Sequence, residues 1–237
     1  MTTPSIFAIV PAAGIGSRMG ADKPKQYLRL AGQSVIEHTL SKLLKVAEIK
    51  NIIVCLAPDD DIFKTLPCAS EKRIILVEGG ATRSESVNNG LNWLKAEGHN
   101  DAWALVHDAA RPCVNPSRIN ALIKQCTAQN AGGILAVPMA NTLRRVNREE
   151  PGKTETVSRE NIWAAHTPQL FRVGELSAGL SLAAAKNIEV TDEASAIESA
   201  GGKVLMVEDE TTNIKVTRPE DLAIASLILN AQEQDLL

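Results

Sequence analysis

The sequence predicts an α/β fold built on a doubly wound, mostly parallel sheet with helices on both faces. Short apolar runs alternate along the chain with helical patterns. The runs are nearly continuous in apolar residues, which is typical of strands buried on both faces. The 237 residues, of which 44% are hydrophobic, are enough for a sizeable core. We therefore expect one domain over residues 1–237 with a Rossmann-like sheet.

The strands are predicted from apolar runs of four to eight residues. Because only 3% of the chain is aromatic, the core must consist mostly of Ile, Leu, Val and Ala. The predicted strands are Ile6–Ala13, Ile52–Ala57, Ile74–Val77, Ala102–Val106, Ile134–Val137 and Val204–Val207.

The helices are predicted from their N-terminal signals. Ser34-Val-Ile-Glu37 and Thr82-Arg-Ser-Glu85 are capping boxes, each followed by an apolar stripe of helical period. Asn115 followed by proline predicts a third helix start, and a fourth is expected near Thr217. Helices between successive strands imply right-handed crossovers.

Residues 139–169 interrupt this alternation, because they contain no convincing helical pattern. The sequence Glu-Glu-Pro-Gly at 149–152 predicts a turn between two polar stretches, Thr142–Val146 and Thr154–Ser158. We predict a β-hairpin arm that projects from the sheet. A long mobile surface loop is the alternative, but long loops without structure of their own are uncommon in compact domains.

Composition excludes several classes of partner and site. A net charge of −3 provides no general attraction to nucleic acid. The N-terminus has no basic segment before its short apolar run, so we expect neither a signal peptide nor a membrane anchor. The four cysteines, without CxxC spacing, predict reduced thiols in a cytoplasmic protein. The four histidines lack metal-ligand spacing, and we assign none of them to catalysis; His107 is expected to pack beside the site.

The glycine-rich stretch after the first strand does not match two familiar phosphate-binding loops. Gly14-Ile-Gly16-Ser-Arg-Met19 lacks the third glycine of a dinucleotide fingerprint, and no carboxylate ends a strand about 20 residues later. The chain also has no G-K-[ST] sequence of a P-loop. In both motifs a helix starts directly at the loop, whereas here the next helix signal is Ser34.

The same stretch has the features of a loop that wraps a triphosphate. Small residues at 11–14, Pro-Ala-Ala-Gly, allow the backbone to approach a ligand and direct its N–H groups at phosphate oxygens. Arg18, Lys23 and Lys25 then place three cations within eight residues. The loop follows the first buried strand, where ligands of open α/β sheets bind. A solvated basic loop is the alternative reading.

These motifs resemble those of a known enzyme family. The pattern P-A-A-G-x-G-x-R-M-G…K-P-K-Q-Y is similar to the signature of nucleotidyltransferases that activate sugar and polyol phosphates. The whole chain resembles the 2-C-methyl-D-erythritol 4-phosphate cytidylyltransferase family in particular. Blocks similar to that family occur in order at Val77–Val87, Leu105–Val114, Gly132–Pro138, Ala164–Phe171, Thr191–Ala196 and Asn213–Leu222.

The resemblance implies roles for individual residues. The implied catalytic residues are Arg18, Lys25 and Lys215. The implied nucleotide-binding residues are Pro11, Ala12, Ala13, Gly14, Gly16, Gly80, Arg83, Ser86, Asp108 and Ala109. The implied contacts to the polyol phosphate are Asp108, Arg111, Thr142, Arg159, Thr167 and Thr191. Where the family often has an acidic residue after the second glycine of its Gly-Gly turn, this chain has Ala81, which weakens any base contact through that side chain.

The resemblance also implies a reaction, a metal and an assembly. A phosphate oxygen of methylerythritol phosphate would attack the α-phosphorus of CTP in line and release pyrophosphate, without a general base or a covalent intermediate. Mg²⁺ or another divalent cation would neutralise the phosphates, with Asp108 near it. The arm at 139–169 would bring Arg159 into the neighbouring subunit of a homodimer.

Three alternatives remain open at the level of sequence. The nearest is a cytidylyltransferase for another polyol phosphate, such as ribitol 5-phosphate. An NAD-dependent oxidoreductase is opposed by the missing third glycine and the missing carboxylate. A catalytically silent nucleotide-binding regulator is opposed by the presence of Arg18, Lys25, Asp108 and Lys215.

Overall fold

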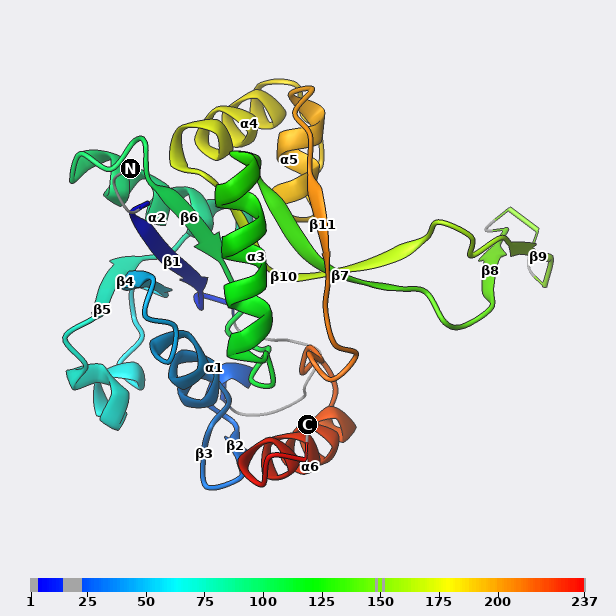
Figure 1. Ribbon diagram of the computed structural model, residues 1–237. Coiled ribbons are helices and arrows are strands. Elements are labelled where there is room, and N and C mark those ends of the chain that lie inside the picture. Colours follow the sequence, from blue (N-terminus) through cyan, green and yellow to red (C-terminus); the bar gives the residue numbers. More distant parts are fainter. Residues whose placement is uncertain (1–3, 15–22, 148, 151, 237) are drawn as a thin grey trace.

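The centre of the protein is a seven-stranded sheet with the strand order β11-β7-β10-β6-β1-β4-β5 (Figure 1). The computed structural model describes residues 4–14, 23–147, 149–150 and 152–236. The strands are β1 (Ile6–Pro11), β4 (Ile49–Leu56), β5 (Ile74–Glu78), β6 (Trp103–Val106), β7 (Gly133–Pro138), β10 (Trp163–Arg172) and β11 (Leu205–Glu208). All neighbours pair in parallel except β10, which runs antiparallel to both β6 and β7. The expected mostly parallel α/β sheet is confirmed.

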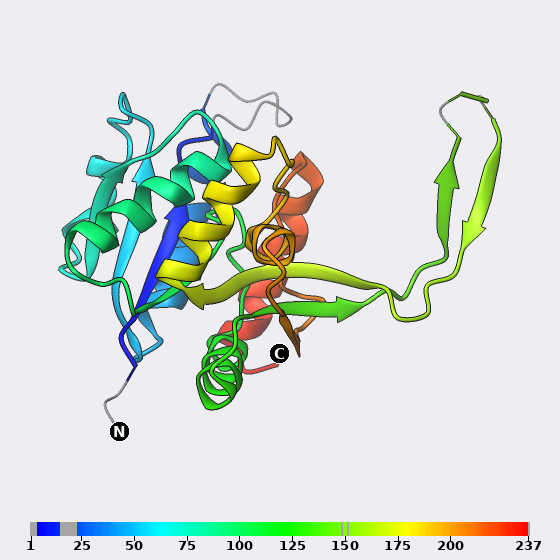
Figure 2. The same ribbon diagram turned by 90° about the horizontal axis from the view of Figure 1, so that it is seen from above.

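Helices cover both faces of this sheet (Figures 1 and 2). They are α1 (Val35–Leu44), α2 (Arg83–Ala96), α3 (Pro116–Gln129), α4 (Val173–Ala185) and α5 (Glu193–Ser199). Helix α6 (Pro219–Glu233) packs instead against Leu30 and Val35, outside this sheet. On one face, Leu40 of α1 and Leu122 of α3 belong to the same buried cluster as Leu105 of β6. On the other, α2, α4 and α5 pack over the alternate residues of the strands, such as Ile9 and Ala104. The strands are therefore apolar on both sides, as their sequences predict.

The predicted helix starts are confirmed, and their capping bonds are present. The backbone N–H of Ser34 donates to the carboxylate of Glu37 (2.8 Å), and the N–H of Glu85 donates to Thr82 Oγ1 (3.1 Å). Asn115 accepts from the backbone of the first turn of α3, which begins with proline. These local bonds satisfy donors that the helix itself cannot pair.

The stretch from β1 to α1 contains no α-helix among its described residues. It comprises a 3-10 helix over Lys25–Tyr27 and two short paired strands, β2 (Arg29–Leu30) and β3 (Gln33–Ser34). Residues 15–22, which include Gly16 and Arg18, lie outside the described residues. The predicted long stretch between the first strand and the helix capped by Ser34 is confirmed, since β1 ends at Pro11 and α1 begins at Val35.

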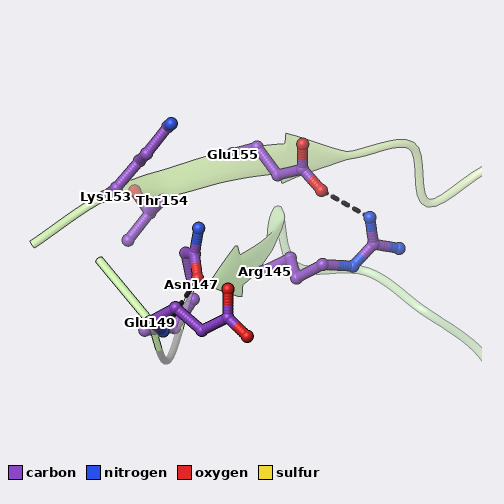
Figure 3. Close-up of a pocket in the computed structure, with 7 residues that line it drawn as sticks. Arg145, Asn147, Glu149, Lys153, Thr154 and Glu155 are labelled. Atoms are coloured by element: carbon purple, nitrogen blue, oxygen red, sulfur yellow. Dashed lines mark hydrogen bonds and ion pairs between the residues drawn. The ribbon is translucent and has the colours of Figure 1, made fainter. Parts of the chain in front are cut away.

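The predicted hairpin is present as β8 (Leu143–Val146) and β9 (Thr154–Val157), paired antiparallel in a sheet of their own. It extends away from the body of the protein (Figures 1 and 2). A hollow of about 410 Å³ lies at its tip, where Arg145 and Glu155 form an ion pair across the two strands (Figure 3). The arm is solvent-exposed along most of its length.

The C-terminal boundary predicted for the arm is wrong. Residues 163–169 are part of β10, a strand of the central sheet, so the arm ends before Trp163 rather than at Gln169. The sequence concealed this strand because His166, Thr167 and Pro168 interrupt its apolar pattern. The sheet accommodates them by a register shift between Ala165 and Gln169. Helices α4 and α5 were also not predicted.

Across the described ranges, no helix has both the length and the apolar character needed to cross a lipid bilayer.

Candidate active site

A cleft of about 150 Å³ lies at the edge of the sheet where β1 and β6 end. In parallel sheets this edge is where ligands bind, because the strand-to-helix loops meet there. The described residues that line it are Pro11, Ala12, Gly14, Lys25, Gln26, Arg83, Asp108, Ala109, Ala110 and Lys215. The fold thus brings together predicted site residues from four separate sequence blocks.

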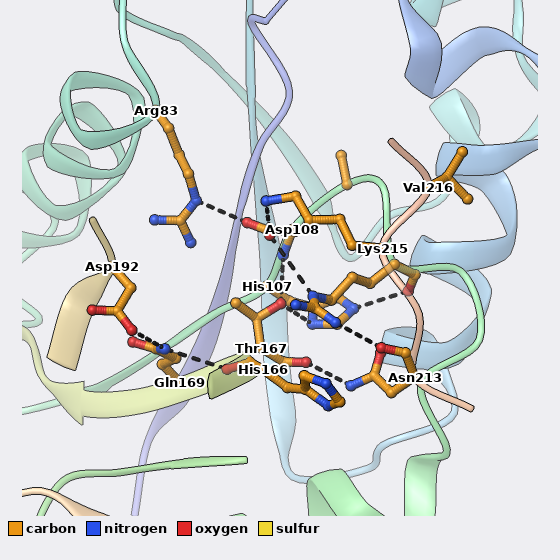
Figure 4. A network of polar contacts seen from close by, with 12 residues as sticks. Arg83, His107, Asp108, His166, Thr167, Gln169, Asp192, Asn213, Lys215 and Val216 are labelled. Carbon is orange, nitrogen blue, oxygen red and sulfur yellow. Dashed lines mark hydrogen bonds and ion pairs between the residues drawn. The ribbon is translucent and has the colours of Figure 1, made fainter. Parts of the chain in front are cut away.

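Asp108 is the buried anion of this cleft. Its carboxylate accepts from Arg83 Nε at 2.8 Å and from Lys215 Nζ at 2.7 Å, and Arg111 Nε lies 3.9 Å away (Figure 4). Burial alone would raise the pKa of this carboxyl, but the charges of Arg83 and Lys215 outweigh it and hold the pKa well below its usual range. Asp108 is therefore anionic, and its charge is compensated by cations from two distant parts of the chain.

Arg83 is held by a second carboxylate that sequence reasoning missed. Its Nη1 and Nη2 donate to the two oxygens of Glu193 at 2.6 and 3.0 Å. Glu193 is the first residue of α5 and its side chain is 2% exposed. Glu193 lies within the Thr191–Ala196 block, but nothing in the sequence pairs it with an arginine 110 residues earlier.

The polar chain behind Asp108 fixes the tautomer of a buried histidine. Burial lowers the pKa of His107 to about 4, so the ring is neutral at neutral pH. Its Nε2 lies 3.1 Å from the carbonyl oxygen of Arg111, which can only accept, so Nε2 carries the hydrogen. The hydroxyl of Thr167 then donates to Nδ1 (3.0 Å) and accepts from the N–H of Asp108 (3.0 Å). In this arrangement the Thr167 proton is already used, and its predicted contact to the polyol phosphate stays a prediction.

Lys215 lies in the connection between β11 and α6, and hydrogen bonds of Asn213 hold this connection in place. The side-chain amide of Asn213 donates to Asp209 Oδ2 at 2.7 Å and to the carbonyl of Thr167 at 2.9 Å. The backbone carbonyl of Asn213 accepts from Arg111 Nη1 at 2.6 Å. His166 Nδ1 lies 2.8 Å from the same oxygen of Asp209. This network fixes the backbone two residues before Lys215.

The far end of the glycine-rich loop is anchored to the end of β1. Gln26, which is buried, donates from Nε2 to the carbonyl of Ala12 at 2.7 Å. The neighbouring Lys25 donates to the carbonyl of Val216 at 3.3 Å, next to Lys215 in sequence. Two of the three predicted catalytic residues, Lys25 and Lys215, therefore line the same cleft. The third, Arg18, lies outside the described residues.

The Gly79-Gly80 turn requires glycine for reasons of space. A Cβ on Gly79 would lie 2.6 Å from the Cβ of Ala13, and one on Gly80 would lie 2.3 Å from the Cβ of Glu85. The buried hydroxyl of Ser86 accepts from the N–H of Gly80 (3.0 Å). The structure therefore assigns Ser86 a role in shaping the turn, and its contact to the nucleotide stays a prediction.

Five of the six predicted contacts to the polyol phosphate lie outside the cleft lining. Two of them, Arg111 and Thr167, are buried behind Asp108. Thr142 and Arg159 are exposed on the arm, on either side of β8 and β9, and Arg159 donates to the carbonyl of Ala140. Thr191 is exposed immediately before α5, two residues from Glu193. The arm that carries Thr142 and Arg159 extends away from the central sheet (Figure 2).

The described residues do not form a ready site for Mg²⁺. No cluster of three or more His, Cys, Asp or Glu side chains suited to a metal occurs among them. Asp108 has the hard oxygen ligands that Mg²⁺ prefers, but each of its oxygens is paired with a cation. A metal cation bound here would be repelled by the positive side chains of Arg83, Arg111 and Lys215, so the geometry fits an anionic ligand better than a metal.

Comparisons with known proteins agree with this geometry. Residues 6–231 match the family model described as 2-C-methyl-D-erythritol 4-phosphate cytidylyltransferase. The enzyme of that name from Pseudomonas syringae pv. tomato is 48% identical over 92% of this chain and 93% of the relative. The one from Vibrio vulnificus strain YJ016 is 44% identical over 97% and 96%.

Solved structures agree as well. The crystal structure of the Francisella tularensis 2-C-methyl-D-erythritol 4-phosphate cytidylyltransferase has a TM-score of 0.80 at 36% identity, covering 94% of this chain and 99% of that one. A crystal structure of a 4-diphosphocytidyl-2C-methyl-D-erythritol synthase has a TM-score of 0.83 at 33% identity, covering 96% and 100%. With a family model that spans nearly its whole length, the chain belongs to the 2-C-methyl-D-erythritol 4-phosphate cytidylyltransferase family.

Proposed function

We propose that this protein transfers CMP from CTP to 2-C-methyl-D-erythritol 4-phosphate, giving CDP-methylerythritol and pyrophosphate for isoprenoid precursor biosynthesis. Membership of the family supports the reaction. The single structural observation that carries it is the convergence of Lys25, Arg83 and Lys215 on one cleft with the buried Asp108. Two polyanions must meet in this reaction, and a cationic cleft at the edge of the sheet reduces their repulsion.

The proposed mechanism requires no protein nucleophile. The phosphate of the acceptor is already anionic near neutral pH and attacks the α-phosphorus of CTP directly, while the bond to the pyrophosphate breaks. Lys25 and Lys215, with Arg18, stabilise the negative charge that grows on the bridging and non-bridging oxygens. Lys25 and Lys215 suit this role because they approach the cleft from opposite ends of the chain and can contact one triphosphate together.

The small residues at the end of β1 and the glycine turn before α2 are proposed to receive the nucleotide. The small residues of Pro11–Gly14 leave the backbone accessible to the ligand. Gly79 brings a second backbone segment, which continues into Gly80, close to Ala13. Ala109 and Arg83 complete this proposed set at the cleft wall. On the acceptor side, Arg111 and Asp108 adjoin each other and are proposed to face the polyol phosphate.

In this proposal a divalent cation enters the site bound to the nucleotide. Because the oxygens of Asp108 are paired with Arg83 and Lys215, Mg²⁺ would arrive on the phosphate oxygens of CTP and retain its waters. When bound, it would neutralise phosphate charge. The metal role predicted for Asp108 is kept as a position near the nucleotide-bound metal, because both of its oxygens are paired with cations before the ligand binds.

The arm is proposed to complete the site of a second copy in a homodimer. It projects as a separate two-stranded sheet, and Val146 near its tip is 63% exposed. Thr142 and Arg159 are exposed on the arm, do not line the cleft of their own chain, and are proposed to reach the acceptor phosphate of a partner. We further propose a cytoplasmic location, which the four free cysteines support because thiols persist in reducing compartments.

Pyrophosphate release tests the proposed function. CTP should support release with methylerythritol phosphate, whereas ATP, GTP and UTP should support much less, and ribitol 5-phosphate should be a poor acceptor. Equal or faster release with ribitol 5-phosphate would favour the rival polyol. Binding of CTP without pyrophosphate release in the presence of either acceptor would indicate a silent nucleotide-binding regulator instead.

A further inference from the structure

Arg83 is held between two buried carboxylates. Its Nε donates to Asp108 and its two terminal nitrogens donate to Glu193, so three of its nitrogens are engaged at 2.6–3.0 Å. The pairing with Glu193 is bidentate, which fixes the plane of the guanidinium as well as its distance. Figure 4 shows Arg83 directed at Asp108 from the α2 side.

Lys215, the other close partner of Asp108, is held much less firmly. Within the described part of the chain, its ammonium has one ion-pair partner, Asp108 at 2.7 Å. Its side chain is 36% exposed against 30% for Arg83, so the difference lies in the second carboxylate that holds Arg83, the 2% exposed Glu193. A lysine ammonium is a compact charge on a flexible stem, so it can change partners without losing a defined hydrogen-bond plane.

This difference matters when a polyanion enters the cleft. A triphosphate would draw Lys215 away from Asp108, and a buried carboxylate that loses its last cation is strongly unfavourable. Asp108 can release Lys215 only if another cation stays in place. Arg83 meets this need at closer range than Arg111, whose Nε lies 3.9 Å from Asp108, because Glu193 holds Arg83 from the far side. Desolvation alone would lower the pKa of Arg83, but the charges of Glu193 and Asp108 raise it.

We propose that Glu193 is a positioning residue: it fixes Arg83 on Asp108 and so leaves Lys215 as the counter-ion that moves to the triphosphate when CTP binds. The part that concerns Lys215 depends on the proposed use of CTP. The part that concerns Glu193 and Arg83 applies to the protein without any ligand.

NMR of side-chain nitrogens separates the two parts. In the free wild-type protein, the Nε–H of Arg83 should exchange slowly with water, and Glu193→Gln should accelerate that exchange by about tenfold or more because charge-assisted bonds are lost. Glu198→Gln, an exposed change on the same helix, is the matched control and should leave the rate unchanged. Arg83→Lys and Lys215→Arg variants assign the two signals.

Addition of CTP with Mg²⁺ then tests the exchange of partners. The Nζ signal of Lys215 should shift strongly, whereas the Nε–H signal of Arg83, which stays on Asp108 at the cleft wall, should shift much less; in Glu193→Gln both should move strongly. Equal shifts of both signals in the wild-type protein would overturn the proposal, and so would unaltered exchange of Arg83 in Glu193→Gln. If CTP moves none of the signals, both the proposed use of CTP and the proposed movement of Lys215 are wrong. The role of Glu193 is still decided by the exchange rate of the Arg83 Nε–H in the ligand-free wild-type and Glu193→Gln proteins.

Kinetics supply a readout that a purely structural role would not produce. Glu193→Gln should lower kcat by on the order of 10- to 100-fold with a smaller change in the KM for CTP, because the lost interaction acts once Lys215 has moved. Glu193→Asp, which keeps the charge, should recover part of kcat. A rise in KM alone, or no recovery with Asp, would contradict the proposal. If Glu193→Gln does not fold, the wild-type comparison of Lys215 with Arg83 remains decisive.

Discussion

The ammonium of Lys215 lies 2.7 Å from the carboxylate of Asp108, which joins the β11–α6 connection to the loop after β6. Neither residue type is unusual by itself, and a surface lysine or a capping aspartate is the ordinary reading of each. Their pairing, with Arg83 on the other oxygen of Asp108, produces a cleft in which the positive charges are already ordered before any ligand arrives.

Loss of Lys25 should reduce turnover by roughly 10² to 10³, because one well-placed donor contributes about 3–4 kcal/mol to the transition state. Steady-state kinetics of Lys25→Ala with CTP and methylerythritol phosphate test this. Lys72→Ala, an exposed lysine before β5, serves as the control for removing one positive charge. Near-normal turnover of Lys25→Ala would show that Lys25 does not act on the reacting phosphates.

Mixed dimers of two variants test the proposed homodimer and the proposed action of its arm on the neighbouring subunit. Lys25→Ala and Arg159→Ala should each be weakly active alone. If Arg159 acts across subunits, refolding equal amounts together should restore about one quarter of wild-type activity, because half the dimers contain one intact site. No recovery, although chromatography shows mixed dimers, would place Arg159 with the site of its own chain.

The free energy of unfolding should decrease as the pH is lowered from about 6.5 to 4, because of the buried His107. Its pKa is about 4 in the folded protein and about 6.5 in the unfolded chain, so the unfolded chain binds more protons between these values. The contribution is complete above pH 6.5 and decreases as the pH falls to 4, by up to about 3 kcal/mol. Urea unfolding at several pH values should show a shallower slope for His107→Gln. Identical slopes would mean that His107 does not titrate as its burial implies.

The low pKa of Asp108 acts in a different pH range. Because its folded pKa is depressed, its contribution is present above the unfolded value of about 3.9 and is lost only as the pH falls below that. The region between pH 4.5 and 6.5 therefore reports on His107 with little interference from Asp108.

Gly80→Ala should destabilise the protein by about 1–3 kcal/mol, because the new methyl group would lie 2.3 Å from the Cβ of Glu85 at the start of α2. Gly174→Ala is the matched control: its Cβ would meet only the carbonyl of Asn100 at 3.6 Å, an ordinary contact in a helix. Denaturant midpoints compare the two. Equal midpoints would show that the turn can shift without cost.

Much of the fold could be predicted from sequence, since the signals involved are local. Continuous apolar runs predicted the strands, and capping residues such as Ser34 and Thr82 predicted helix starts that the structure confirms. The hairpin followed from its turn residues. Strand β10 could not be predicted, because Thr167 and Pro168 are polar or strand-breaking residues whose place is decided by neighbouring strands.

The candidate site also contains residues that could be predicted from the sequence and residues that could not. The resemblance to the family implied that Lys25, Asp108 and Lys215 belong to one site, and the structure brings them together in one cleft. Glu193 was missed because its importance depends on a pairing with Arg83 from another part of the chain. The network of Asn213, Asp209 and His166 was missed for the same reason. Long-range pairs between polar residues leave no periodic signal in one sequence.

The central claim is the transfer of CMP to a polyol phosphate, and phosphorus NMR of the reaction mixture tests it most directly. With CTP, methylerythritol phosphate and Mg²⁺, we expect pyrophosphate to appear together with an equal amount of a new diphosphate that carries both the cytidylyl and the methylerythritol phosphorus atoms. Hydrolysis of CTP to CMP without such a diphosphate, or equal product formation from UTP, would contradict the account.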